Sequence, residues 1–215
     1  MKSPYRNLLT AFSIVALISF IGYLSYIKNK QEHTEVAKIK EGALLETESA
    51  LPSLGGAFKL INTKGEVRTD KNYHGQFHMI YFGYTYCPDI CPTGLQSMSH
   101  AAQALKAENI VVKPIFITID PARDTKEQLA LYGQNFDPSF DMLTGDIKAI
   151  DHTKQLFKVY GNKSSDDRGM HDYLLDHSSL IYVMNPRGQF VGYFDHATSS
   201  QDMVTKIKAM MQEAH

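Results

Sequence analysis

Apolar runs alternate with amphipathic stretches from residue 51 onward, and this alternation predicts strands interspersed with helices. Two stretches are almost continuously apolar and are typical of buried strands, residues 77–85 (FHMIYFGYT) and 111–120 (VVKPIFITID). Between them, residues 95–108 repeat apolar side chains at helical spacing. A buried strand, a helix and a second buried strand in this order indicate an α/β domain.

The rest of this region continues the same alternation. The predicted elements are a strand–turn–strand over 57–69, a helix over 125–136, a short strand over 141–144, a helix over about 147–160, a polar loop over 161–170, a hairpin over 179–195 and a helix over 200–213. Thr125 and Gln128 have capping-box spacing at the start of the second helix. Together these elements predict an α/β fold with a central mixed sheet flanked by helices.

The first fifty residues follow a different pattern. Residues 8–27 carry no charge, and such a stretch is long enough to cross a hydrocarbon core of about 30 Å. It exceeds the apolar core of a cleaved signal peptide, which is about 7–15 residues long. We therefore expect a short cytoplasmic tail (1–7), one transmembrane helix (8–27), a polar tether (28–50) and a globular domain (51–215).

Two features predict on which side of which membrane the globular domain lies: the short tail (1–7) before the span, and the lack of a transit-peptide pattern. A tail of seven residues makes a cytoplasmic amino terminus the simpler topology, although the lysines and arginine on the two sides of the span are nearly balanced. The segment is neither Arg-rich nor Ser-rich, which disfavours a mitochondrial transit peptide. The prediction is a single-pass protein of a bacterial inner membrane with its globular domain in the periplasm.

Overall charge gives no sign of a nucleic-acid partner. Lys and Arg number 22 against 23 Asp and Glu, so the net charge is −1. No basic cluster interleaved with aromatic residues is visible. We therefore expect no nucleic-acid binding.

The chain's two cysteines lie together in residues 83–94, GYTYCPDICPTG, between a predicted strand and a predicted helix. Three residues separate Cys87 from Cys91, and a proline follows each. Pro92 suggests that the helix begins there with Cys91 at its cap, where the helix dipole favours the thiolate. A static disulfide would close a very short loop and gain little stability. A redox dithiol and a pair of metal ligands both remain open at this point, although thioredoxin-type dithiols usually have two intervening residues.

Histidine is the residue type that would complete a thiolate site for copper(I) or zinc. Of nine histidines, His177 stands directly before a strongly apolar strand. In thioredoxin-like folds the loop before the equivalent strand packs beside the cysteine motif and usually carries a proline, and here it carries a histidine. His177 is therefore the expected third ligand, and His171, six residues earlier, is a weaker candidate that we expect to lie in a loop.

A third motif, TIDPARDT at residues 118–125, ends the second buried strand. Asp120 lies at the same sheet edge as the cysteines and is a candidate to hydrogen-bond a ligand or a partner beside the metal. Asp120 and Pro121 are equally compatible with a simple turn. For Arg123 and Asp124 we expect a local ion pair next to a helix cap.

Taken together, the segments YFGYTYCPDICP, DPARDT and YLLDHSS closely resemble the Sco/SenC family, as does the single amino-terminal anchor. The resemblance covers about residues 51–213. It implies a thioredoxin-like fold that binds one copper ion through Cys87, Cys91 and His177, and a role in assembling the dinuclear copper centre of cytochrome c oxidase. Members deliver copper, keep the acceptor's cysteines reduced, or both.

The function expected from this resemblance is that of a membrane-anchored copper chaperone, which is not an enzyme. Its expected partners are the copper-accepting subunit of cytochrome c oxidase and another copper chaperone or a thiol reductant. The alternative is a thiol–disulfide reductase in which Cys87 attacks and Cys91 resolves. A peroxide-reducing activity is a weaker third option, and a purely structural role would require neither thiol.

Overall fold

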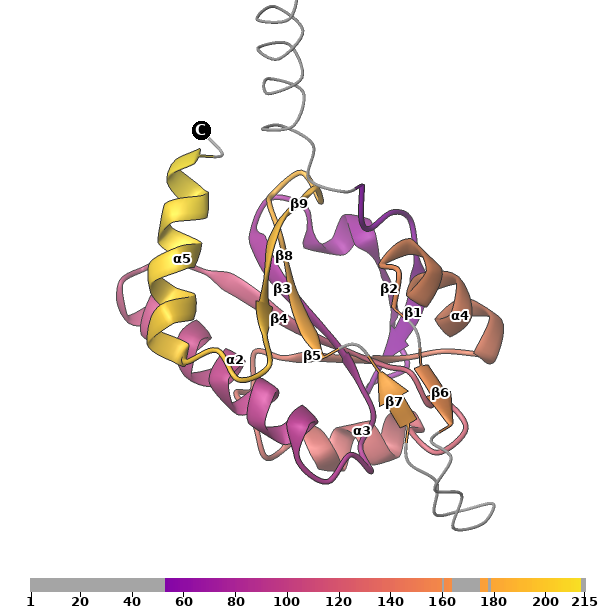
Figure 1. Cartoon of the computed structure of the whole chain (residues 1–215). Helices are drawn as coiled ribbons and strands as arrows, with labels where there is room; N and C mark the ends of the chain where they lie inside the picture. Colours follow the sequence, from indigo (N-terminus) through magenta and orange to yellow (C-terminus); the bar gives the residue numbers. More distant parts are fainter. Residues whose placement is uncertain (1–52, 160, 164–174, 178, 214–215) are drawn as a thin grey trace, which may run out of the picture. The chain divides into compact units, whose positions relative to one another are not determined.

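A seven-stranded mixed sheet forms the centre of the computed structural model, which describes residues 53–159, 161–163, 175–177 and 179–213 (Figure 1). The strand order is β2-β1-β5-β4-β3-β8-β9. The strands are β1 (Lys59–Asn62), β2 (Val67–Thr69), β3 (Phe77–Gly83), β4 (Val112–Thr118), β5 (Asp141–Thr144), β8 (Leu180–Met184) and β9 (Phe190–Asp195). A separate antiparallel pair joins β6 (Gly161–Lys163) to β7 (Leu175–His177).

The two long apolar runs form the middle of the sheet, as predicted. β3 and β4 pair in parallel along their whole length, and every residue of β3 is buried. Strands covered on both faces need apolar side chains on both faces, which explains why their sequences are continuous rather than alternating. β5 extends the parallel set beside β4, while β8 and β1 pair antiparallel with their neighbours.

Helices cover both faces of this sheet. They are η1 (Asp70–Tyr73), α2 (Ile90–Ala107), α3 (Lys126–Gly133), α4 (Ile147–Leu156) and α5 (Ser200–Glu213). α2 and α5 pack against each other on one face, and α4 lies on the other (Figure 1). Ring contacts mark the two faces: Phe116 meets Tyr132 of α3 at 5.9 Å, and Phe82 meets Phe157, directly after α4, at 5.2 Å between centroids.

Most predicted boundaries are close to the observed ones. The hairpins β1–β2 and β8–β9 are confirmed, and Thr125 caps α3 by accepting a hydrogen bond from the Gln128 N–H at 3.2 Å. Two expectations were wrong. α2 begins at Ile90 rather than at Pro92, and residues 161–163 form a strand rather than part of a loop.

The expected anchor (8–27), its flanking tail and tether, and His171 lie outside the described residues. Among the helices that the structure describes, none has both the length and the apolar character needed to cross a membrane.

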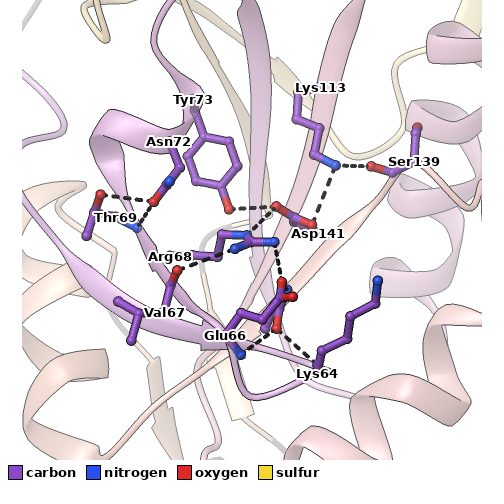
Figure 2. A network of polar contacts seen from close by, with 11 residues as sticks. Lys64, Glu66, Val67, Arg68, Thr69, Asn72, Tyr73, Lys113, Ser139 and Asp141 are labelled. Carbon is purple, nitrogen blue, oxygen red and sulfur yellow. Dashed lines mark hydrogen bonds and ion pairs between the residues drawn. The ribbon is translucent and has the colours of Figure 1, made fainter.

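A polar cluster joins the strands where β4 and β5 begin (Figure 2). Asp141 accepts a hydrogen bond from the Tyr73 hydroxyl at 2.9 Å, and its carboxylate lies 3.5 Å from both Arg68 Nε and Lys113 Nζ. Burial and the neighbouring Asp141 carboxylate raise the pKa of Tyr73. Because β4 and β5 are parallel, their carboxyl ends lie at the opposite edge, which leaves that edge for the cysteine loop.

Candidate metal site

Both cysteines lie where β3 ends and α2 begins. Cys87 is in the connecting loop, and Cys91 is the second residue of α2. Both are buried thiols, with exposed fractions of 7% for Cys87 and 0% for Cys91. The Cys91 N–H donates to Cys87 Sγ at 3.4 Å, so one turn of chain brings the first sulfur against the start of the helix. This edge of the sheet is the usual ligand position in open α/β folds.

Gly83, the last residue of β3, makes room for the second thiol. A Cβ atom at this position would stand 2.8 Å from Cys91 Sγ, 3.0 Å from the Phe116 ring and 3.1 Å from the Tyr81 ring. All three of these side chains are fully buried. The strand therefore needs glycine here because the sulfur of Cys91 occupies the space that any side chain would fill.

The electrostatic surroundings of Cys91 differ from the expectation. A helix amino terminus was expected to favour the thiolate, but the hydrogen bond with Cys87 and burial raise the pKa of Cys91. Hydrogen bonds with the Tyr84 backbone and with the Tyr81 side chain lower this pKa but are weaker. The raised pKa favours the protonated thiol, so binding of a metal through Cys91 releases a proton.

Asp120 and Arg123 form the polar rim beside the cysteine loop. Arg123 Nε lies 2.6 Å from Asp120 Oδ2, and both side chains are largely buried. The Arg123 guanidinium also lies over the Tyr86 ring, 4.8 Å from its centroid. Tyr86, the residue before Cys87, is 51% exposed. The expected ion pair of Arg123 with Asp124 is thus wrong, because Arg123 pairs with Asp120.

Asp124 also differs from the expected role beside a helix cap. It is fully buried, and its carboxylate accepts hydrogen bonds from the Thr85 backbone N–H at 3.0 Å, the Thr85 hydroxyl at 2.6 Å and the Thr118 hydroxyl at 2.6 Å. Burial raises the pKa of Asp124, while these hydrogen bonds oppose the rise. The sequence alone did not indicate this role, since Thr85 is 39 residues away along the chain.

His177 is described by its backbone alone. It ends β7 and pairs with Gly161 in β6. Among the side chains that the structure describes, no three His, Cys, Asp or Glu residues are grouped as a metal site. The His177 side chain is not among them, so the three-ligand site remains a prediction.

The donor set that is described suits copper. Both sulfur atoms are buried, and the Cys91 sulfur lies beside Gly83 together with the Tyr81 and Phe116 rings. Soft thiolate ligands in such surroundings favour copper(I) over hard cations. The pair can equally support thiol–disulfide chemistry, because the two cysteines are held within one turn of chain.

Comparison with known proteins gives a consistent result. Residues 46–212 match the model of the SCO1/SenC family. The chain is 37% identical over 196 residues to Protein sco1 of Schizosaccharomyces pombe, a match that covers 90% of this chain and 73% of the relative.

Two solved structures have the same fold. Arabidopsis thaliana ScoI with copper bound is 34% identical, with a TM-score of 0.70 over 74% of this chain and 99% of that one. Bradyrhizobium japonicum ScoI with copper bound is 36% identical, with a TM-score of 0.66 over 73% of this chain and 99% of that one. The expected thioredoxin-like α/β fold is confirmed.

Proposed function

Because the chain belongs to the SCO1/SenC family, we propose that it is a copper chaperone for the assembly of cytochrome c oxidase. Its cargo is one copper ion, held by Cys87, Cys91 and His177. The observation that carries this proposal is the pair of buried thiols at the junction of β3 and α2, in a chain whose relatives include copper-bound structures.

A site with three ligands explains how the copper can be passed on. Two thiolates and one imidazole leave the ion accessible to an incoming ligand, whereas a closed four-ligand structural site resists exchange. Transfer to the copper-accepting subunit of the oxidase then proceeds by replacing one ligand at a time. Because the pKa of Cys91 is raised, its thiol takes up a proton when copper leaves, so copper transfer is coupled to proton uptake.

Replacing each ligand tests the assignment. Cys87→Ala, Cys91→Ala and His177→Ala are each expected to abolish binding of one copper per chain without unfolding the domain. His100→Ala is the matched control, since His100 is exposed on α2 and contacts Gln96. If His177→Ala bound copper as the wild type does, the assignment of His177 as the third ligand would be refuted.

A second candidate is a thiol–disulfide reductase that keeps the acceptor's cysteines reduced. It is favoured by the contact between the Cys91 N–H and Cys87 Sγ, which holds the cysteines in position to react in sequence. The Cys87 thiolate attacks the acceptor's disulfide and forms a mixed disulfide, and Cys91 then releases the reduced acceptor as the chain's own disulfide forms. A thiol reductant must restore the chain. Disulfide turnover that is unaffected by His177→Ala would favour this role.

The proposed location follows from the amino-terminal sequence. Residues 8–27 anchor the chain in a bacterial inner membrane, residues 28–50 form the tether, and residues 51–215 form the domain in the periplasm. The proposed partners are the copper-accepting oxidase subunit and a copper donor or thiol reductant. Alkaline phosphatase fused after residue 50 is expected to be active, because that enzyme needs an oxidising compartment. An inactive, stable fusion would contradict the topology.

A further inference from the structure

Asp124 is not a proposed copper ligand, but it lies where the carboxyl ends of three strands, β3, β4 and β5, come together. Besides its bonds to Thr85 and Thr118, its backbone C=O accepts the Thr144 hydroxyl at 3.0 Å. Its own N–H donates to the Asp120 C=O at 2.9 Å. The ends of β4 and β5 and the loop after β3 thus converge on one residue.

Two of the three hydrogen bonds to this carboxylate come from Thr85. One comes from the backbone N–H and one from the hydroxyl, so together they fix the backbone position and the side-chain rotamer of Thr85. Hydrogen bonds to an ionised carboxylate are about twice as strong as those between neutral groups. Thr85 itself is only half-buried, and it stands two residues before Cys87.

We propose that Asp124 and Thr85 are a positioning pair that holds the Cys87 loop in the geometry needed to bind copper. The effect on copper rests on the function proposed above, whereas the effect on the loop does not. Neither residue is one of the proposed copper ligands. Asp124 is immobilised by β4 and β5, and through Thr85 it transfers this rigidity to the loop that carries the first sulfur.

Two substitutions separate positioning from simple stabilisation. Thr85→Val removes the hydroxyl bond between the loop and Asp124. Thr144→Val removes a hydroxyl bond to the same residue but from β5, which does not carry a cysteine. Thr85→Ser keeps both the hydroxyl and the backbone N–H and should restore the wild-type properties.

The test uses the full chain with both thiols reduced. Copper(I) affinity is measured by competition with a chromophoric chelator, and exchange of the Cys87 amide hydrogen is measured without metal. Thr85→Val is expected to weaken copper binding roughly tenfold or more, as loss of a group that orients a ligand does. It should also speed up exchange at Cys87. Thr144→Val and Thr85→Ser should leave both quantities near the wild-type values.

Equal effects of Thr85→Val and Thr144→Val on both quantities would overturn the proposal, as would wild-type behaviour of Thr85→Val. If the wild-type chain bound no copper, the proposed function would fail. The exchange rate of the Cys87 amide in the three variants would still decide the positioning role.

Discussion

Replacing Gly83 with alanine would insert a methyl group between the end of β3 and the Cys91 sulfur. The new Cβ would stand 2.8 Å from Cys91 Sγ and within about 3 Å of the Phe116 and Tyr81 rings. None of these three groups has exposed surface into which it could move. Accommodating the methyl group therefore requires the sulfur or the strand to shift.

The expected cost combines two effects of opposite sign. Overpacking a close-packed core costs about 1–3 kcal/mol, and the loss of glycine's freedom in the unfolded chain returns about 0.4–1 kcal/mol. Gly83→Ala should therefore lower the free energy of unfolding by about 1.3 kcal/mol at the middle of these ranges and by at most about 2.6 kcal/mol. The assay is equilibrium denaturation of the reduced chain, followed by copper(I) competition, in which binding should also weaken because Cys91 is displaced.

Gly94→Ala is the matched control from the same neighbourhood. Gly94 lies inside α2, where a Cβ would meet His196 at 3.4 Å and Tyr81 at 3.5 Å, which are ordinary contacts. Alanine in a helix interior is favoured over glycine by about 0.8–1 kcal/mol, so this variant should be slightly more stable than the wild type. If Gly83→Ala matched the wild type in both stability and copper affinity, the close approach of Cys91 to β3 would be refuted.

Two further predictions concern positions away from the thiols. Burial lowers the pKa of His78 to about 4 from the ordinary 6.5, so the unfolded chain takes up a proton there that the folded chain refuses. As the pH is lowered from 6.5 to 4, this group should reduce the free energy of unfolding by up to about 3 kcal/mol. His78→Gln should remove this contribution to the pH dependence of the free energy of unfolding, measured by denaturation at a series of pH values. Asp141→Ala leaves the buried Tyr73 hydroxyl without its partner, which should cost about 1–3 kcal/mol in thermal or chemical unfolding. Copper affinity should not change, because Asp141 lies at the other end of the sheet, and a weakened affinity would contradict this separation.

The central strands could be predicted because a strand that is buried on both faces has apolar residues at consecutive positions. β3 and β4 are covered on both faces, so their apolar runs are unbroken and easily recognised. β6 (Gly161–Lys163) is short and polar and therefore lacks the apolar pattern of a strand, and its partner β7 begins only at Leu175, so no tight hairpin turn marks the pair.

The start of α2 shows a limit of local rules. Proline is common at the first position of a helix, but Pro92 is the third residue of α2, after Ile90 and Cys91. The first N–H groups of a helix have no partner within it, so a proline is tolerated throughout the first turn. The rule therefore placed the boundary two residues late.

The candidate site was predictable where its residues are neighbours in sequence. Cys87 and Cys91 share one loop and one helical turn, and their position at the sheet edge followed from the elements around them. The role of Asp124 was missed because two of the three hydrogen bonds to its carboxylate come from Thr85, which is 39 residues away along the chain. Its sequence neighbours suggested a helix cap, and the nearby Thr125 has that role.

The most direct test of the copper-chaperone assignment is the copper stoichiometry of the full chain in two redox states. With both thiols reduced, we expect one copper ion per chain, bound with release of protons. After oxidation of Cys87 and Cys91 to a disulfide, binding should be lost. A reduced chain that binds no copper, or an oxidised chain that binds it equally well, would contradict the assignment of this thiol pair as the copper site.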